Sequence, residues 1–482
     1  MPIEASASRS FALLAAMSLL LAACAVGPDY RRPEVAVPDE FSAPNVAQFD
    51  SSASDREFWK AFDDPLLTEL IEDALRSNHD VRIAFARLAE ARALRGEARL
   101  DLAPTVTAAA SGADARSSER QTPAPNVSRD QDYYDAGFDA FWELDFFGRV
   151  RRGIEAQTAL VQAAEAGLYD THVTITAEVA RNYFELRGAQ QRLEVARRNA
   201  ANQEQSLRIT QARLEGGRGT QLDVSRAQAL LSATRATIPD LEAQVRFAML
   251  RLGVLTGRSP EALVPRLAEA KPLPELPRTH RIGTPELLLR RRPDIQIAER
   301  ELAAATARIG VAVADLFPRV SFVGGWGFDA VDVDDLGNAS SETFAFGPSI
   351  QWAAFDLGRV KRRIQQREAA ASGALARYEQ SVLRALEETD ASLTAYAQAL
   401  AKQQHLRQSA QSSADAARIA RARFESGVAD FLTVLDAERT MLEAEDRLAA
   451  SETETATALL SVYKALGGGF RPVAATALSA AR

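Results

Sequence analysis

The sequence has few of the residues that build reactive or cross-linked sites. Among its 482 residues are one cysteine, four histidines and four methionines. The single cysteine, Cys24, leaves no intrachain disulfide possible. The histidines form no i, i+4 pair and have no cysteine partner, so no metal site is predicted. We find no catalytic set, phosphate-binding loop or dinucleotide-binding glycine motif, and therefore predict neither an enzyme nor a cofactor.

The sequence also lacks an excess of basic residues. Its net charge is −8, with 46% hydrophobic and 25% charged residues. This composition allows a large core but gives no sign of nucleic-acid binding.

The apolar run at residues 11–21 is short for a membrane helix but fits the core of a signal peptide. Arg9 precedes it, and small residues lead from it to Cys24. A chance cysteine behind a secretion signal is the alternative. We favour a bacterial lipoprotein signal with lipidation at Cys24. Ala25, which is not Asp, favours passage to the outer membrane.

The dominant feature is an internal repeat with an offset of 210 residues, covering 148–257 and 358–467. Each copy reads as a helical hairpin with a glycine in its turn, Gly217 in the first and Gly427 in the second. Such repeats reveal the unit from which a fold is built. Other matching pairs are Arg213 and Arg423, Glu215 and Glu425, Leu222 and Leu432, and Val224 and Val434.

Both hairpins carry a heptad pattern on both arms, which is typical of an antiparallel coiled coil. No proline interrupts the first arm, residues 149–214, and at 1.5 Å per residue it would span roughly 100 Å. The heptad phase continues through Pro239, so we predict a kink there and not an end. The second hairpin has more Gln, Ala, Ser and Thr at its core positions. We therefore expect it to be the looser of the two.

Four segments have a period of two instead, at 105–113, 133–144, 319–329 and 343–352. Aromatic side chains gather on one face of these segments, as in transmembrane β-strands. The edge of a soluble sandwich is the alternative. Four strands cannot close a barrel, and lipid does not tolerate an open edge. If the strands lie in a membrane, several chains must share one barrel.

These patterns give a domain organisation. Residues 1–23 are the signal peptide and 24–62 a lipid-anchored, extended arm. Repeat 1 (63–257) contains a helix, a β-hairpin at 105–145 and a helical hairpin at 148–257. A proline-rich linker, 258–284, follows. Repeat 2 (285–467) contains a helix, a β-hairpin at 319–355 and a helical hairpin at 358–467. Residues 468–482 read as a disordered tail.

Several motifs are distributed along the chain from residue 24 to about 467. They are Cys24-Ala25-Val26-Gly27-Pro28-Asp29-Tyr30-Arg31-Arg32-Pro33, the segment 58–66, Leu144-Asp145-Phe146-Phe147-Gly148, Arg291-Arg292-Pro293-Asp294-Ile295, and Ala422-Arg423-Phe424-Glu425-Ser426-Gly427 through Val434-Leu435-Asp436-Ala437. Together they resemble the outer-membrane factor family, the TolC-like channels, and above all the lipoprotein branch that serves RND (resistance-nodulation-division) multidrug efflux. The resemblance implies a mostly α-helical trimeric channel, with a shared 12-stranded β-barrel in the outer membrane and a long α-barrel in the periplasm.

The resemblance also implies roles for the two helical turns. In the family these turns form the periplasmic tip, where an adaptor (membrane fusion) protein docks, and an inner-membrane RND transporter feeds the duct. The glycines can also simply end helices, and both readings can hold. The residues in the tip positions are Arg213, Leu214, Glu215, Gly217, Arg423, Phe424, Glu425 and Gly427.

Family channels close at this end, often through rings of aspartates, and Asp430 and Asp436 are the candidates here. This chain departs from the pattern at Thr433, where some members carry another aspartate, and at Ala429, where one has arginine. The gating bonds therefore differ from those of some relatives. Asp436 can also be an ordinary solvated helix charge.

The expected function is passive export of drugs or other small toxic molecules through a homotrimer in outer-membrane lipid. The energy must then come from a partner. Two alternatives remain: a duct of the same fold for protein secretion or metal export, and a periplasmic coiled-coil scaffold lipoprotein without a pore. The alternating aromatic strands argue against the scaffold.

Overall fold

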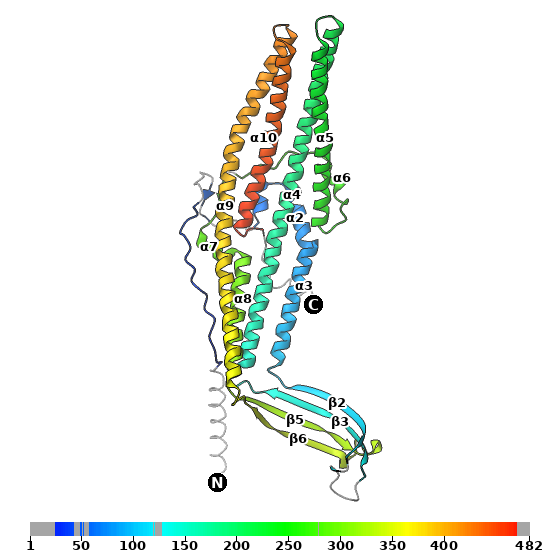
Figure 1. Ribbon diagram of the computed structural model, residues 1–482, viewed down its shortest axis with the longest axis vertical. Coiled ribbons are helices and arrows are strands. Elements are labelled where there is room, and N and C mark those ends of the chain that lie inside the picture. Colours follow the sequence, from blue (N-terminus) through cyan, green and yellow to red (C-terminus); the bar gives the residue numbers. More distant parts are fainter. Residues whose placement is uncertain are drawn as a thin grey trace. The chain divides into compact units, whose positions relative to one another are not determined.

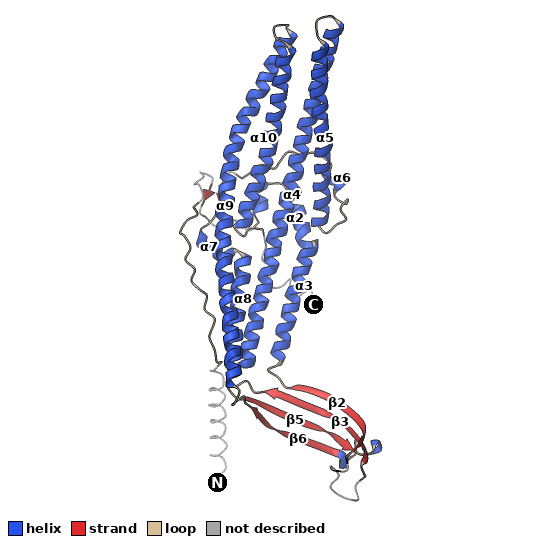
Figure 2. Cartoon of the chain, viewed as in Figure 1, coloured by secondary structure: helices blue, strands red, loops and turns tan. Residues whose placement is uncertain are grey.

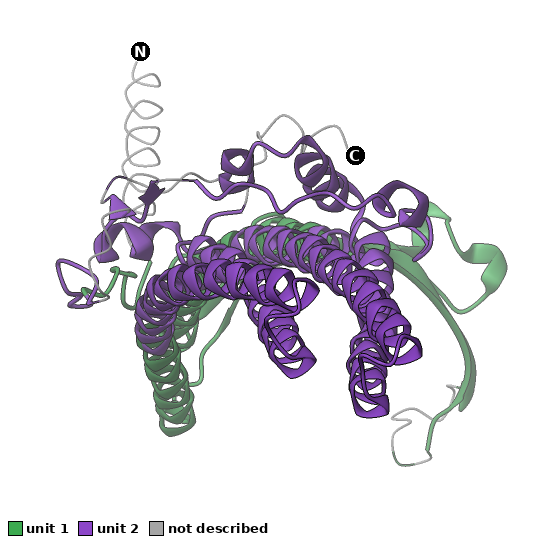
Figure 3. Cartoon of the chain, turned by 90° about the horizontal axis from the view of Figure 1, so that it is seen from above, with its two compact units in different colours: residues 1–34, 87–165, 297–379 green, residues 35–86, 166–296, 380–482 purple. Residues whose placement is uncertain are grey.

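The computed structural model describes residues 25–42, 49, 50, 52, 57–118, 120, 128–277 and 279–469. The predicted signal peptide, the lipidation of Cys24 and the disordered state of the tail beyond Gly469 lie outside these residues. The chain divides into two compact units (Figure 3). The first comprises residues 1–34, 87–165 and 297–379, and the second comprises 35–86, 166–296 and 380–482.

The first unit contains one antiparallel sheet, shown in red in Figure 2, with the order β2-β3-β5-β6. The predicted period of two is confirmed, and all four predicted segments are strands. Phe138 pairs with Trp326 across β3 and β5, and their rings stack at 6.3 Å between centroids. The strands are β2 (Thr105–Arg116), β3 (Asp130–Glu143), β5 (Arg319–Ala330) and β6 (Glu342–Gln351).

The repeat is visible in how the sheet joins the helices. Trp142 donates its indole N–H to the carbonyl of Leu102 at 2.9 Å, and Trp352 donates to Leu316 at 3.0 Å. The tryptophans are 210 residues apart, and each bonds to the turn that ends the preceding helix. These helices are α3 (His79–Leu100) and α8 (Pro293–Ala314).

Glycines in the Gly324-Gly325-Trp326-Gly327 run of β5 allow close packing in the sheet. A Cβ at Gly324 would overlap the ring of Phe346, and one at Gly327 would lie 2.6 Å from the carbonyl oxygen of Ala136. The two glycines thus make room for an aromatic ring and for the neighbouring strand.

The N-terminal arm is held in the first unit by a buried arginine. Arg152 donates to Asp29 at 2.7 Å and to the carbonyls of Val26 and Gly27 at 3.2 and 3.3 Å. A Cβ at Gly27, whose φ is +95°, would overlap the backbone of Gly310. The segment just after Cys24 is therefore fixed to this unit by hydrogen bonds and close packing.

The chain contains two long helical hairpins (Figure 1), and the greater part of each belongs to the second unit. The first is α4 (Arg149–Glu215) and α5 (Gln221–Leu255), and the second is α9 (Leu357–Glu425) and α10 (Phe431–Ala465). Helix α5 continues through Pro239, as predicted. Smaller elements are β1 (Phe49–Asp50), η1 (Phe58–Phe62), α2 (Pro65–Ser77), α6 (Val264–Leu267), β4 (His280–Arg281) and α7 (Pro285–Arg291).

The heptad positions of both hairpins are largely buried, which confirms the predicted seams. Leu186, Leu231 and Leu252 are at most 1% exposed, and Thr455 and Val462 are fully buried. The thinner second seam satisfies its hydroxyls internally, since Thr455 donates to the carbonyl of Ser451 at 2.8 Å.

One glycine of α4 has a packing role that periodicity does not reveal. A Cβ at Gly188 would overlap the hydroxyl and methyl groups of Thr453 on α10. Gly153, in the same helix, has nothing within 4 Å of the corresponding position. Gly188 therefore lets two helices from different hairpins approach closely.

None of the helices in the described part of the chain combines the length and apolar composition that a bilayer-spanning helix needs.

A buried histidine gives the second unit a pH-dependent stability. His280 is 1% exposed, and its ring nitrogens lie 2.7 Å from the hydroxyl of Tyr396 and 3.3 Å from that of Tyr463. Burial lowers the pKa of His280 to about 4. An unfolded histidine titrates near pH 6.5. The unfolded chain thus takes up the proton first, and stability is lost as pH falls from about 6.5 towards 4.

We expect His280→Gln to flatten this part of the pH–stability profile. The measurement is the thermal unfolding midpoint between pH 4 and 8. His405→Gln, at an exposed position on α9, is the matched control and should leave the slope unchanged. An unaltered slope in His280→Gln would contradict the assignment.

Candidate functional site

The two hairpin turns have the same backbone structure. Gly217 has φ +68° and donates to the carbonyl of Leu214 at 3.0 Å; Gly427 has φ +76° and donates to Phe424 at 2.9 Å. In each turn the next N–H bonds back to the arginine carbonyl, which completes a Schellman motif. Nothing lies within 4 Å of a Cβ at either glycine. The glycines are thus required for backbone conformation and not for space.

The helices that leave the turns are capped by different side chains. Thr220 and Asp223 form a capping box at the start of α5. Asp430 caps α10, where its carboxylate accepts from the N–H of Thr433 at 2.9 Å and from its hydroxyl at 2.7 Å. These bonds from Thr433 lower the pKa of Asp430. Asp430 therefore has a structural role at the turn, besides its predicted place at the gate.

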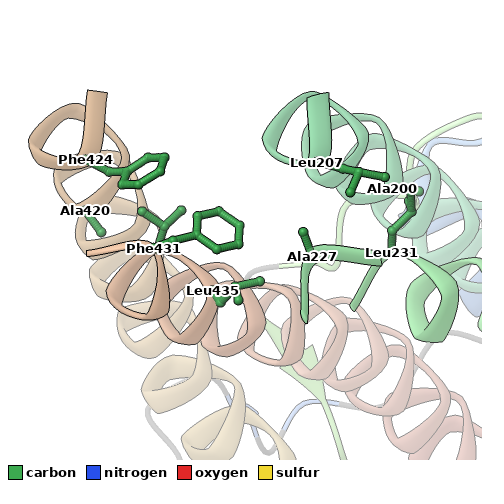
Figure 4. Packing of buried hydrophobic residues seen from close by; sticks show 9 residues of the cluster. Ala200, Leu207, Ala227, Leu231, Ala420, Phe424, Phe431 and Leu435 are labelled. Atoms are coloured by element: carbon green, nitrogen blue, oxygen red, sulfur yellow. The ribbon is translucent and has the colours of Figure 1, made fainter. Parts of the chain in front are cut away.

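The structure brings the two turns together through Arg213 and Phe424. Arg213 donates to the carbonyl oxygen of Phe424 at 2.7 Å, and its guanidinium carbon lies 3.8 Å from the centre of the Phe424 ring. Phe431 packs on the same ring at 5.3 Å between centroids (Figure 4). Among the other tip residues, Glu215, Glu425 and Arg423 are exposed and Leu214 is half-buried.

A shared hydrophobic cluster lies beneath the turns and involves all four long helices (Figure 4). It consists of Ala200, Leu207, Ala227, Leu231, Ala420, Phe424, Phe431, Val434 and Leu435. Its composition explains why the tips keep a defined position within the chain, because apolar burial joins one hairpin to the other.

The candidate gate residues Asp430 and Asp436 line one groove between α9 and α10, and no hydrogen bond joins them in the described part of the chain. The groove has a volume of about 760 Å³ and includes Asp430, Thr433 and Asp436. Asp436 is exposed and pairs with Arg439 on its own helix at 2.9 Å. The structure therefore places both predicted aspartates on one surface, each already engaged with a neighbouring residue.

A buried polar contact near the tip was missed from the sequence. Glu438 on α10 is 2% exposed and accepts from Ser206 of α4 at 2.8 Å and from Arg421 of α9 at 2.7 Å. It lies next to a heptad position, where a glutamate is usually solvated, so no sequence pattern pointed to it. The contact ties three helices together just below the turns.

Within the described ranges, no group of three or more His, Cys, Asp or Glu side chains could hold a metal ion.

The arrangement of helical hairpins and strands matches known proteins. The family described as outer membrane efflux protein matches residues 70–258 and 284–468. The chain belongs to this family. Each matched segment contains one β-hairpin and one helical hairpin, so the outer membrane efflux proteins share both halves of the repeat.

Relatives cover nearly the whole chain. Outer membrane protein OprJ of Pseudomonas aeruginosa is 33% identical over 457 residues, 94% of this chain and 95% of that protein. The probable efflux pump outer membrane protein TtgC of Pseudomonas putida is 30% identical over 469 residues, 96% of each. The solved outer-membrane channel OprN has a TM-score of 0.86 at 43% identity, and the match covers 92% of this chain and 99% of that one.

The matches to these proteins establish the fold of the chain and its location. The chain has the fold of TolC-like trimeric channels and is an outer-membrane efflux protein that extends into the periplasm. The family consists of channel proteins.

We expect Asp436→Ala to reduce the preference of the open pore for cations, because carboxylates repeated around an aperture attract cations. A change in the cation-to-anion permeability ratio of about twofold is expected. Reversal potentials in planar bilayers under a salt gradient would measure it. Asp415→Ala is the matched control, since Asp415 forms the same kind of exposed pair, with Arg418 at 3.2 Å. An unchanged ratio would remove Asp436 from the gate.

Proposed function

We propose that three copies of this chain form the outer-membrane exit duct of a tripartite RND efflux system. The duct passively exports drugs or other small toxic molecules, which an inner-membrane pump and a periplasmic adaptor hand over. The relative TtgC is named as the outer membrane protein of an efflux pump, which supports this reading.

The observation that carries the proposal is the pair of free edges on the sheet. In the described part of the chain, β2 and β6 each pair on one side only. Large apolar side chains also stay exposed on the sheet: Phe344 is 72% exposed, Ile350 70% and Phe346 60%. In lipid, such apolar side chains are stable, but unpaired strand edges are not. Joining β6 of one copy to β2 of the next would satisfy the edges.

Six of the eight tip residues divide into two roles in this proposal. The exposed carboxylates Glu215 and Glu425, together with the turns at Gly217 and Gly427, form the surface offered to the adaptor. Arg213 and Phe424 face each other, so they hold the shape of that surface from beneath.

The experiment is the mass and conductance of the detergent-extracted protein. We expect a trimer that forms ion-conducting pores in a planar bilayer. A monomer or dimer without conductance would favour the lipoprotein scaffold. Deleting the gene should raise drug sensitivity, and unchanged drug sensitivity together with lost protein secretion or metal tolerance would point to the alternative ducts.

A further inference from the structure

The internal repeat gives each chain two tips with the same backbone but with different side-chain chemistry. Tip 1 is the turn between α4 and α5, and tip 2 is the turn between α9 and α10. Tip 1 contributes Arg213 to a contact with Phe424 of tip 2. At an offset of 210, the counterpart of Arg213 is Arg423, and the counterpart of Phe424 is Leu214.

This second pair, Arg423 and Leu214, is not satisfied within one chain. Arg423 is exposed and forms no ion pair or side-chain hydrogen bond with any residue that the structure describes. The carbonyl of Phe424 accepts from both Gly427 and Arg213, whereas that of Leu214 accepts from Gly217. A carbonyl oxygen has two lone pairs, so Leu214 can accept one more donor. Each chain thus offers an unused donor on tip 2 and a matching acceptor on tip 1.

A ring of chains brings these groups together. In a closed head-to-tail assembly, tip 1 and tip 2 alternate, and the tip 2 of each copy meets the tip 1 of the next. We propose that Arg423 of one copy donates to the carbonyl of Leu214 of the neighbouring copy. This contact, the tip seam, repeats between copies the bond that Arg213 makes within a copy. The proposal rests on the trimer of the proposed function.

The tip seam is the weaker of the two contacts. Within a chain, the guanidinium of Arg213 stacks on an aromatic ring, which adds a cation–π attraction, and Phe431 supports that ring from α10. At the seam, Leu214 has no ring, and Gln221 stands at the position equivalent to Phe431. The Arg423–Leu214 contact between neighbouring copies therefore breaks before the Arg213–Phe424 contact within one copy.

Cross-linking tests the geometry. The full-length double variant Leu214→Cys/Arg423→Cys is treated in detergent with a short bifunctional maleimide and then denatured. We expect covalent dimers and trimers on the gel. The two variants that carry only one of the introduced cysteines, Leu214→Cys and Arg423→Cys, should give monomers, which controls for reaction at Cys24. Monomers alone from the double variant would overturn the seam. The mass of the native, uncross-linked protein distinguishes failure of the tip seam from failure of the trimeric duct. A trimer that does not cross-link would contradict only the tip seam. The absence of a trimer would contradict both proposals.

Strengthening the seam tests its energetics. Leu214→Phe supplies the missing ring, and we expect a fall of about tenfold in the open probability of single channels, since three added cation–π contacts must break together. Leu214→Met, similar in size but without a ring, should have little effect. Leu214→Phe/Arg423→Gln should restore opening. If the double variant stays closed, or if Leu214→Met closes the channel equally, the proposal fails.

Discussion

Gly427→Pro should abolish most of the efflux activity while leaving the trimer intact. Gly427 has φ +76°, which proline cannot adopt, and its N–H donates to Phe424 at 2.9 Å. Proline removes this donor and distorts the turn, at a cost of about 3 kcal/mol. If the adaptor recognises the native turn, a penalty of that size lowers docking by a factor of about 100. Drug susceptibility of a deletion strain complemented with the variant would measure the loss.

Two further variants make this result interpretable. Gly427→Asn should keep much of the activity, because asparagine tolerates the left-handed conformation better than other residues with a side chain. A bulky residue at Gly217, where φ is +68°, should impair efflux in the same way. Trimer yield in detergent is the control for folding. Full efflux by Gly427→Pro would show that the tip assignment is wrong.

Arg292→Ala should strongly destabilise the protein. Arg292 is buried in the Arg291-Arg292-Pro293-Asp294-Ile295 motif. It donates to Asp294 at 2.8 and 3.0 Å, to Glu388 of α9 at 2.6 Å and to the carbonyl of Ala465 at 2.7 Å. Removing the guanidinium leaves these acceptors without their cation. Breaking a buried ion pair in this way lowers the free energy of unfolding by about 3–5 kcal/mol. Because the carboxylates of Asp294 and Glu388 are partly exposed, we expect a loss at the lower end of this range. We expect a lower thermal unfolding midpoint and less trimer.

Arg290→Ala is the matched control for this prediction. Arg290 lies two residues earlier and pairs with Glu286 at 2.9 Å, but both side chains are about 70% exposed. Exposed pairs of this spacing contribute only about 0.3–0.5 kcal/mol. Similar unfolding midpoints for the two variants would mean that the buried cluster contributes little to stability.

Regular patterns allowed much of the architecture to be predicted. Because helices repeat every 3.6 residues and strands every two, buried helix positions such as Leu231 and Leu252, and neighbouring aromatics on one face of a strand such as Trp326 and Phe328, stand at fixed spacings in the sequence. The repeat offset likewise paired the two turns. Gly217 and Gly427 were found in this way, and both adopt the positive φ that a helix-ending glycine is expected to have.

The partners of individual side chains could not be predicted in this way. Arg213 and Phe424 are 211 residues apart, and Ser206 and Glu438 are 232 apart. Their contacts depend on how one hairpin lies against the other, and no local period encodes that placement. The overlap that forbids a side chain at Gly188 has the same origin, since Thr453 comes from the other hairpin.

The sequence by itself thus determined the two hairpins, the four strands, the turns that join them and the family. These features follow from local backbone geometry and from spacing along the chain. Only the tertiary structure decided that Arg213 joins the two tips and that Arg292 connects α7, α9 and the end of α10. Such bonds form between groups that folding brings within about 3 Å of each other, and a linear pattern does not contain that distance.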